Sequence, residues 1–128
     1  MSLLAHANAD FLTGVHHKDD TYALALFLED PGSPENFVSG DECSACKGGI
    51  MLTNYRVQTN SDGKASMHFS DIHLDGVSLR YRYALLFNTS KDNRTISKVD
   101  IGRVTGVEFG VASIFMPEGG LVVFGGEQ

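Results

Sequence analysis

The sequence is poor in the residues that mark several large protein classes. It has two cysteines, Cys43 and Cys46, which are too few and too close together to staple a secreted fold. No apolar run approaches the roughly 20 residues of a membrane helix. The start, MSLLAHANADFLT, lacks the basic and then apolar regions of a secretory signal. We therefore expect an uncleaved cytoplasmic product with no membrane partner.

Basic residues are also few, with 10 Lys and Arg against 16 Asp and Glu, for a net charge of -6. Residues 1–46 hold eight of the acids and only one base, Lys18. A nucleic-acid-binding surface needs clustered Lys and Arg to neutralise phosphates. The charge balance therefore excludes nucleic acid as the expected partner.

The composition is that of a folded chain. Its 128 residues are 42% hydrophobic and 20% charged, which suits one globular domain over residues 1–128. Residues 1–14 predict a short helix with Ser2 as its N-cap and Gly14 as its end. TYALALFL, residues 21–28, is apolar on both faces and predicts a buried strand. Residues 29–49 hold two of the three prolines and many acids, and predict a long acidic loop.

The rest of the chain alternates short apolar strands with turn residues. Three hairpins are predicted: residues 50–59 with 64–69, residues 79–88 with 94–102, and residues 104–115 with 120–124. Gly102, Gly106 and Gly110 indicate a kinked or bulged strand. The predicted fold is all-β, an antiparallel β-sandwich or barrel of about six to seven strands with one short N-terminal helix.

The CSAC segment is the sharpest chemical motif. Cys43 and Cys46 have the spacing of one half of a zinc site, but a structural site needs four ligands. His68 and His73, or a neighbouring subunit, would have to supply the others. A redox dithiol is a further alternative, and two reduced loop cysteines are favoured over both. We predict no metal site.

Two other polar clusters have ordinary explanations. His16 and His17 stand beside acids in residues 16–20, where a general base is conceivable but a solvated loop is favoured. Asp71, His73 and Asp75 alternate, so that an extended segment would place them together for a cation, although capping of the SDIHLDG turn is favoured. No nucleophile has a base at a recognisable spacing. We therefore predict no catalytic residue and no cofactor.

Several segments together resemble small accessory virion proteins of tailed bacteriophages, of the capsid decoration or head-fibre type. The segments are the early Thr-Tyr-x-x-x-Leu strand, the late aromatic-Ala-x-x-aromatic strand that turns into an Asp-aliphatic-Gly strand, and the final Gly-Leu-x-aliphatic strand. The matching residues are Thr21, Tyr22, Leu26, Tyr83, Ala84, Phe87, Asp100, Ile101, Gly102 and Gly120 to Val123. The CSAC loop departs from the family pattern.

This resemblance implies a structural protein without catalytic residues, which oligomerises on the virion surface. We expect it to bind phage capsid or tail subunits and to decorate or stabilise the particle, after synthesis in the host cytoplasm. The alternative from another class is a small-molecule-binding β-barrel protein, which needs an enclosed apolar cavity. An enzyme is the third alternative, and it needs convergent titratable groups in a cleft.

The expected contact surfaces follow from charge and apolarity. The irregular acidic loop and the N-terminal helix are predicted to meet a basic partner. Their expected contact residues are Glu29, Asp30, Glu35, Asp41, Glu42, Leu4 and Phe11. The late segment is more apolar than one sheet face requires, which predicts self-association, with a homotrimer favoured. The expected residues of that interface are Val111, Ile114, Phe115, Leu121 and Val123.

Overall fold

The computed structural model describes residues 2–59, 65–114, 116 and 122–124, and it is built mostly of antiparallel strands. In chain order the elements are β1 (Ser2–Leu3), α1 (Ala5–Leu12), β2 (Tyr22–Phe27), the 3-10 turn η1 (Ser44–Cys46), β3 (Ile50–Met51), β4 (Arg56–Thr59), β5 (Ala65–His68), β6 (Ile72–Asn88), the 3-10 turn η2 (Thr89–Lys91), β7 (Arg94–Ile114) and β8 (Val122–Phe124). The predicted all-β class with one N-terminal helix is confirmed.

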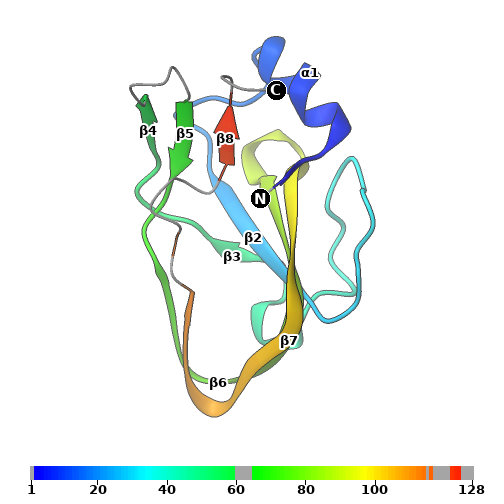
Figure 1. Ribbon diagram of the computed structural model, residues 1–128, viewed down its shortest axis with the longest axis vertical. Helices are drawn as coiled ribbons and strands as arrows, with labels where there is room; N and C mark the ends of the chain where they lie inside the picture. Colours follow the sequence, from blue (N-terminus) through cyan, green and yellow to red (C-terminus); the bar gives the residue numbers. More distant parts are fainter. Residues whose placement is uncertain (1, 60–64, 115, 117–121, 125–128) are drawn as a thin grey trace.

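The strands form two sheets (Figure 1). The larger sheet has the order β1-β7-β6-β2-β3, and the smaller one has the order β4-β5-β8. The described residues thus form eight strands, slightly more than predicted. The two sheets do not close into a barrel, so the barrel, predicted as the alternative to a sandwich, is wrong.

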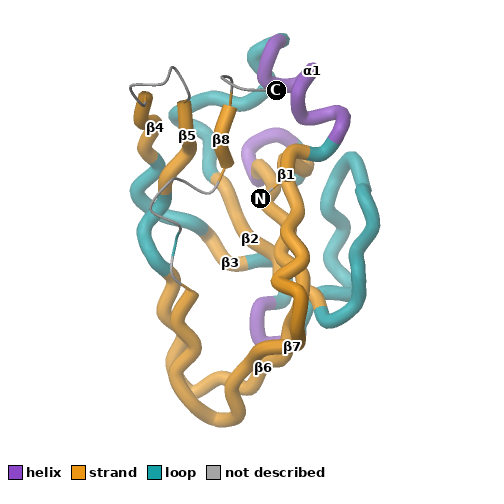
Figure 2. The backbone as a smooth tube through the Cα atoms, in the orientation of Figure 1, coloured by secondary structure: helices purple, strands orange, loops and turns teal. Residues whose placement is uncertain are grey.

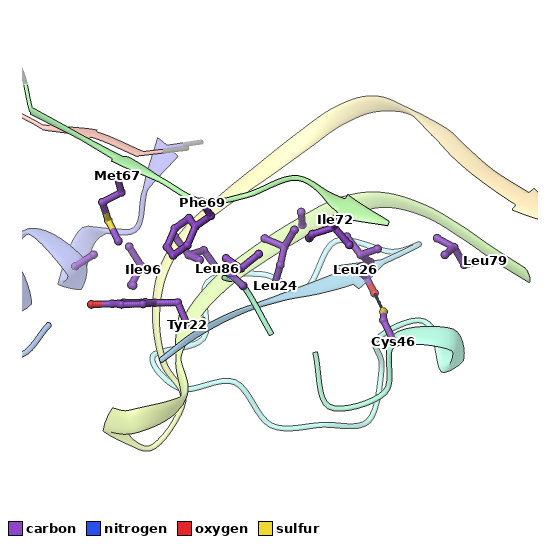
Figure 3. Close-up of a cluster of buried hydrophobic side chains, with 13 residues drawn as sticks. Tyr22, Leu24, Leu26, Cys46, Met67, Phe69, Ile72, Leu79, Leu86 and Ile96 are labelled. Atoms are coloured by element: carbon purple, nitrogen blue, oxygen red, sulfur yellow. Dashed lines mark hydrogen bonds between the residues drawn. The ribbon is translucent and has the colours of Figure 1, made fainter. Parts of the chain in front are cut away.

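Strand β2 lies inside the larger sheet and is buried at all six positions. Because side chains alternate along a strand, its residues enter two separate apolar clusters. Tyr22, Leu24 and Leu26 join the larger cluster, to which β5 and the segment after it contribute Met67 and Phe69 (Figure 3). The alternate residues join a smaller cluster on the other face. The predicted strand, apolar on both faces, is confirmed.

The long loop covers the smaller cluster. Its Phe37 side chain is 5% exposed and stacks on Phe87 of β6, with ring centroids 4.4 Å apart. The Phe27 ring meets Phe37 edge-on at 6.2 Å. The Phe37 amide donates to the carbonyl of Asn93 at 2.8 Å, which ties the loop to the start of β7. Residues 29–49 therefore form a loop, as predicted, and one of its roles is to shield the second face of the sheet.

Strands β6 and β7 form one long hairpin that bends sharply, at the bottom of Figure 1. They have 17 and 21 residues and pair from Ile72 with Ile114 to the η2 end. Residues 104–114 therefore continue β7, and the separate hairpin predicted for residues 104–115 with 120–124 is wrong. The turn predicted at residues 70–76 is mostly strand, because Gly76, with φ 63°, absorbs a bulge instead of a reversal.

The residues of β6 enter different apolar clusters along the strand. Thr105 pairs with Tyr81 but Asp100 pairs with Tyr83, so β7 has extra residues between these pairs. Leu79 and Tyr81 pack with the larger cluster, whereas Tyr83 and the residues after it at alternate positions pack with the smaller one. The alternating apolar residues 79–87 therefore do not all contact one cluster.

Three local predictions are corrected. Ser2 is not a helix cap, because it lies in β1 opposite Lys98, and Leu4 is the N-cap residue. The strand predicted for residues 50–59 is divided into β3 and β4, and Asn54 between them has a left-handed φ of 59°. The hairpin of β4 with β5 is confirmed, while its turn at residues 60–63 lies outside the described residues.

Strand β5 is largely buried on both faces, although Ser66 and His68 are polar. Ser66 and His68 are 1% and 7% exposed. Each of the two side chains has a hydrogen-bond partner in the other, because the Ser66 Oγ and His68 Nε2 atoms lie 2.8 Å apart. Burial of two polar side chains is tolerated when they pair in this way.

Candidate functional site: a groove at the hairpin bend

An open groove of about 820 Å³ lies where the bend of the β6–β7 hairpin approaches the turn η1. Figure 2 shows η1 as the purple turn beside the lower part of the hairpin. The walls of the groove come from the end of β2, the long loop and both strands of the hairpin. The lining residues are Leu28, Asp41, Cys43, Ser44, Ser78, Leu79, Arg80, Val104, Thr105, Gly106 and Glu108.

Two aliphatic side chains of the groove are left in water. Leu28 is 40% exposed and Val104 is 44% exposed, while Leu79 of β6 is buried. At the groove, strands β6 and β7 approach each other closely at Gly106. A Cβ atom at Gly106 would overlap the carbonyl oxygen of Leu79, so a residue without a side chain is required there.

The groove also carries charges that are unpaired within the described part of the chain. The side chains of Asp41, Arg80 and Glu108 are exposed and have no ion-pair partner there. Nearby, Arg82 is held by Asp100 through bonds of 2.8 and 3.0 Å. The groove thus combines exposed apolar area with two acids and one base.

The two cysteines are free thiols whose sulfur atoms are hydrogen-bonded to backbone carbonyls. Cys43 Sγ donates to the Arg80 carbonyl at 2.9 Å, and Cys46 Sγ donates to the Cys43 carbonyl at 3.3 Å. Burial and the neighbouring Cys46 raise the pKa of Cys43 to about 11. Burial likewise raises the pKa of Cys46. A raised pKa disfavours the thiolate that both zinc binding and thiol exchange require.

The two histidines proposed as further zinc ligands, His68 and His73, form hydrogen bonds with serine side chains instead. His68 is paired with Ser66 inside β5, and His73 Nδ1 is hydrogen-bonded to Ser113 Oγ at 3.0 Å. Within the described residues no group of three or more metal-ligating side chains comes together. Asp71, of the alternating set, accepts a hydrogen bond from the amide of Met116.

The acidic loop uses much of its charge within its own chain. Asp30 pairs with Lys98 at 2.8 Å, and Glu35 pairs with Arg94 at 3.3 Å. Glu29 remains exposed, and no described residue pairs with it. Of the five acids predicted to meet a partner, Asp41 is the one that lines the groove.

Glu42 and Leu4 were predicted to contact a partner, but both are buried within the chain. Glu42 is 5% exposed, and its carboxylate accepts hydrogen bonds from the Ser39 hydroxyl and from the amides of Gly40 and Gly48. Although burial opposes the charge, these bonds lower the pKa of Glu42 to about 2. Leu4 is 7% exposed and packs in the smaller apolar cluster. Sequence alone gives no sign that this acid closes its own loop.

The other predicted contact residues are placed as follows. Phe11 is half-buried, and its ring lies 4.7 Å from that of His16. Ile114 packs against the larger cluster of its own chain. Phe115 and Leu121 lie outside the described residues, and so do the side chains of Val111 and Val123.

Residues 16–20 are only partly the solvated loop that was favoured. His17, Lys18 and Asp19 are exposed. The side chain of His16 is 0% exposed and that of Asp20 is 9% exposed. Their burial comes from α1 and from the hairpin end at η2, which are distant in sequence, so the local pattern does not reveal it.

Comparison of the chain with protein families, with curated proteins and with solved structures finds no match. Among the described residues, no helix has the length and apolarity needed to cross a bilayer.

Proposed function

We propose that this protein is an accessory structural protein of a tailed-bacteriophage virion, which docks on capsid or tail subunits through the groove at the hairpin bend. The sequence resemblance supports the class of protein. The observation that supports the docking site is the groove itself, where Leu28 and Val104 are exposed beside Asp41 and Glu108, two charges that pair with no described residue. The protein is then made in the host cytoplasm and ends on the virion.

The chemistry of the groove defines its partner segment. Covering the exposed parts of Leu28 and Val104 contributes about 1 kcal/mol each, by scaling the value for a whole aliphatic side chain to the exposed fraction. Asp41 and Glu108 favour a basic residue beside that apolar contact, mainly by speeding encounter. The partner is therefore a segment of a capsid or tail subunit with an aliphatic side chain flanked by Lys or Arg.

Co-sedimentation with virus particles that lack this protein tests the proposal. Val104→Asp places a charge in the groove, and Val57→Asp makes the same change on β4, where Val57 is 56% exposed and outside the groove. We expect Val57→Asp to bind as the unchanged protein does and Val104→Asp to lose at least tenfold in affinity. Equal binding by both variants would show that the groove is not the docking site. Absence of binding by the unchanged protein would contradict the proposed function.

Self-association belongs to the same proposal, with a homotrimer as the expected form. Light scattering at micromolar concentration distinguishes a trimer from a 13.9 kDa monomer. The alternative function, small-molecule binding, requires an enclosed apolar cavity, whereas this groove is open to solvent. A fragment screen with Leu28 and Val104 methyl signals as reporters distinguishes that function from protein docking.

A further inference from the structure

The His16 side chain is fully buried where α1 meets the end of the β6–β7 hairpin. Its ring packs on Phe11 of α1, at 4.7 Å between centroids, and lies 6.4 Å from the ring of Tyr22. Among the described residues, His16 Nε2 is a buried side-chain atom with no hydrogen-bond partner. Such an atom costs free energy in the folded state, so its retention calls for an explanation.

Asn88, the last residue of β6, fixes the protonation of the ring. Its Nδ2 atom donates to His16 Nδ1 at 2.9 Å and to Asp20 Oδ2 at 2.8 Å. Its Oδ1 atom accepts from the amide of Ser90 at 3.0 Å. Because an amide nitrogen only donates, His16 Nδ1 must present its lone pair, and the proton of the neutral ring is on Nε2.

A charged imidazole does not fit this arrangement. A proton on Nδ1 would face the NH₂ group of Asn88, so two donors would oppose each other. Rotation of the Asn88 amide by 180° does not relieve this clash. It would set Oδ1 against the carboxylate of Asp20 and NH₂ against the amide of Ser90.

The acids around the ring are already engaged by cations. Asp10 Oδ2 on α1 lies 3.9 Å from His16 Nε2, but it accepts from Arg94 of β7 at 2.7 Å. Asp20, before β2, is paired with Lys91 of η2 at 3.0 Å. Burial lowers the pKa of His16, and Asp10 and Asp20 oppose this shift without reversing it.

We propose that His16 is an acid-sensitive catch, which holds α1 and residues 13–20 on the hairpin end while neutral and releases them when protonated. In the opened state the imidazole is in water and titrates near its ordinary pKa of about 6.5. Falling pH therefore favours opening, by up to about tenfold per pH unit below about 6.5. Opening uncovers the buried part of Phe11 and the edge of Tyr22.

Two acids of the same cluster act in a lower pH range. Arg94 holds the pKa of Asp10 below its usual value. Although burial opposes it, hydrogen bonds from Asn88 and Lys91 lower the pKa of Asp20. A carboxylate with a lowered pKa loses its stabilising effect only below the unfolded pKa of about 3.9. Of these three groups, His16 is therefore the one that acts between about pH 6.5 and 4.5.

Hydrogen exchange of the full chain between pH 7.5 and 4.5, corrected for intrinsic rates, tests the catch. The reporters are the amides of Gly14 and Val15, which bond to the carbonyls of Phe11 and Asp10, and the reference amides are those of β2. The matched variants are His16→Asn, which keeps an acceptor near Nδ1 and does not titrate, and His17→Asn at the exposed neighbour. We expect the Gly14 and Val15 opening equilibria to rise at least tenfold in the unchanged chain and in His17→Asn, and to stay flat in His16→Asn.

Three results would overturn the proposal. They are a flat profile in the unchanged chain, a rise of the same size at the β2 amides, and a pH response that survives in His16→Asn. Nitrogen NMR of the unchanged chain gives a test that does not depend on any variant folding. It is expected to show the Nε2–H tautomer of His16 at pH 7, and an Nδ1–H tautomer would contradict the catch.

Discussion

Arg94, the first residue of β7, holds Asp10 of α1 through bonds of 2.7 Å from Nε and 3.3 Å from Nη2. The two residues are 84 positions apart in the sequence. The side chain of Asp10 is 11% exposed and that of Arg94 is 25% exposed, so water screens the pair only in part. This pair fastens the only α-helix of the described residues to the hairpin.

We expect Asp10→Asn to lower the free energy of unfolding by about 1.5 to 3 kcal/mol at pH 7, because a partly buried guanidinium loses a charged acceptor. Urea unfolding measures the loss. The pKa of Asp10 is lowered in the folded chain, so its contribution is present above about pH 3.9 and disappears as the pH falls further. Glu35→Gln is the control, since the Glu35 side chain is 72% exposed and its pair with Arg94 is worth about 0 to 1 kcal/mol.

A second prediction concerns Glu42, which links residues 39 and 40 of the loop to Gly48. Glu42→Gln retains the shape but sets an NH₂ group among the Ser39, Gly40 and Gly48 donors, and we expect a loss of about 2 kcal/mol. Because the pKa of Glu42 is lowered to about 2, its stabilisation is complete above about pH 5 and declines as the pH falls toward 2. Thermal unfolding at pH 7 and pH 3 checks this, and a variant difference that grows at pH 3 would contradict it.

A third prediction concerns the hairpin bend. We expect Gly106→Ala to cost about 1 to 3 kcal/mol, because the added methyl group overlaps the backbone of Leu79 and Arg80. Gly40→Ala is the matched control, since its Cβ position is open and its φ is not in the left-handed region. Chemical denaturation of both variants measures the difference. A Gly106→Ala variant as stable as Gly40→Ala would show that the strands separate at the bend without penalty.

Local patterns predict those parts of the fold that depend on local chemistry. The alternation in TYALALFL gives β2, and the polar residues between positions 88 and 94 give the hairpin end. The length of β6 and β7 is not predictable in this way. Gly76 belongs to a segment predicted as a turn, yet with a φ of 63° it serves a bulge within paired strands, whereas Gly102, with a φ of 91°, lies at a bulge of β7 as predicted. A bulge and a turn have the same local signature, and the partner strand decides between them.

The groove is less predictable than the strands, because its residues come from four separate parts of the chain. The loop was predicted as a contact surface because it is acidic, and its residue Asp41 does line the groove. Val104 and Glu108 were not predicted as contacts, since they read as members of an ordinary strand. Lys98 and Arg94 neutralise Asp30 and Glu35 through tertiary pairing, which no count of charges along the chain reveals.

The final prediction is that Cys43 reacts slowly with alkylating reagents although it lines the groove. Its pKa of about 11 is roughly two units above that of an ordinary thiol, so the reactive thiolate is about 100-fold scarcer at pH 7.5. Mass spectrometry of iodoacetamide labelling, in native buffer and in urea, measures the ratio for each cysteine. Cys43→Ser keeps a donor for the Arg80 carbonyl and is expected to fold with a loss below about 1 kcal/mol. Labelling of native Cys43 as fast as in urea, or one zinc ion bound per chain that Cys43→Ser loses, would show that the pair is a reactive or metal-binding site.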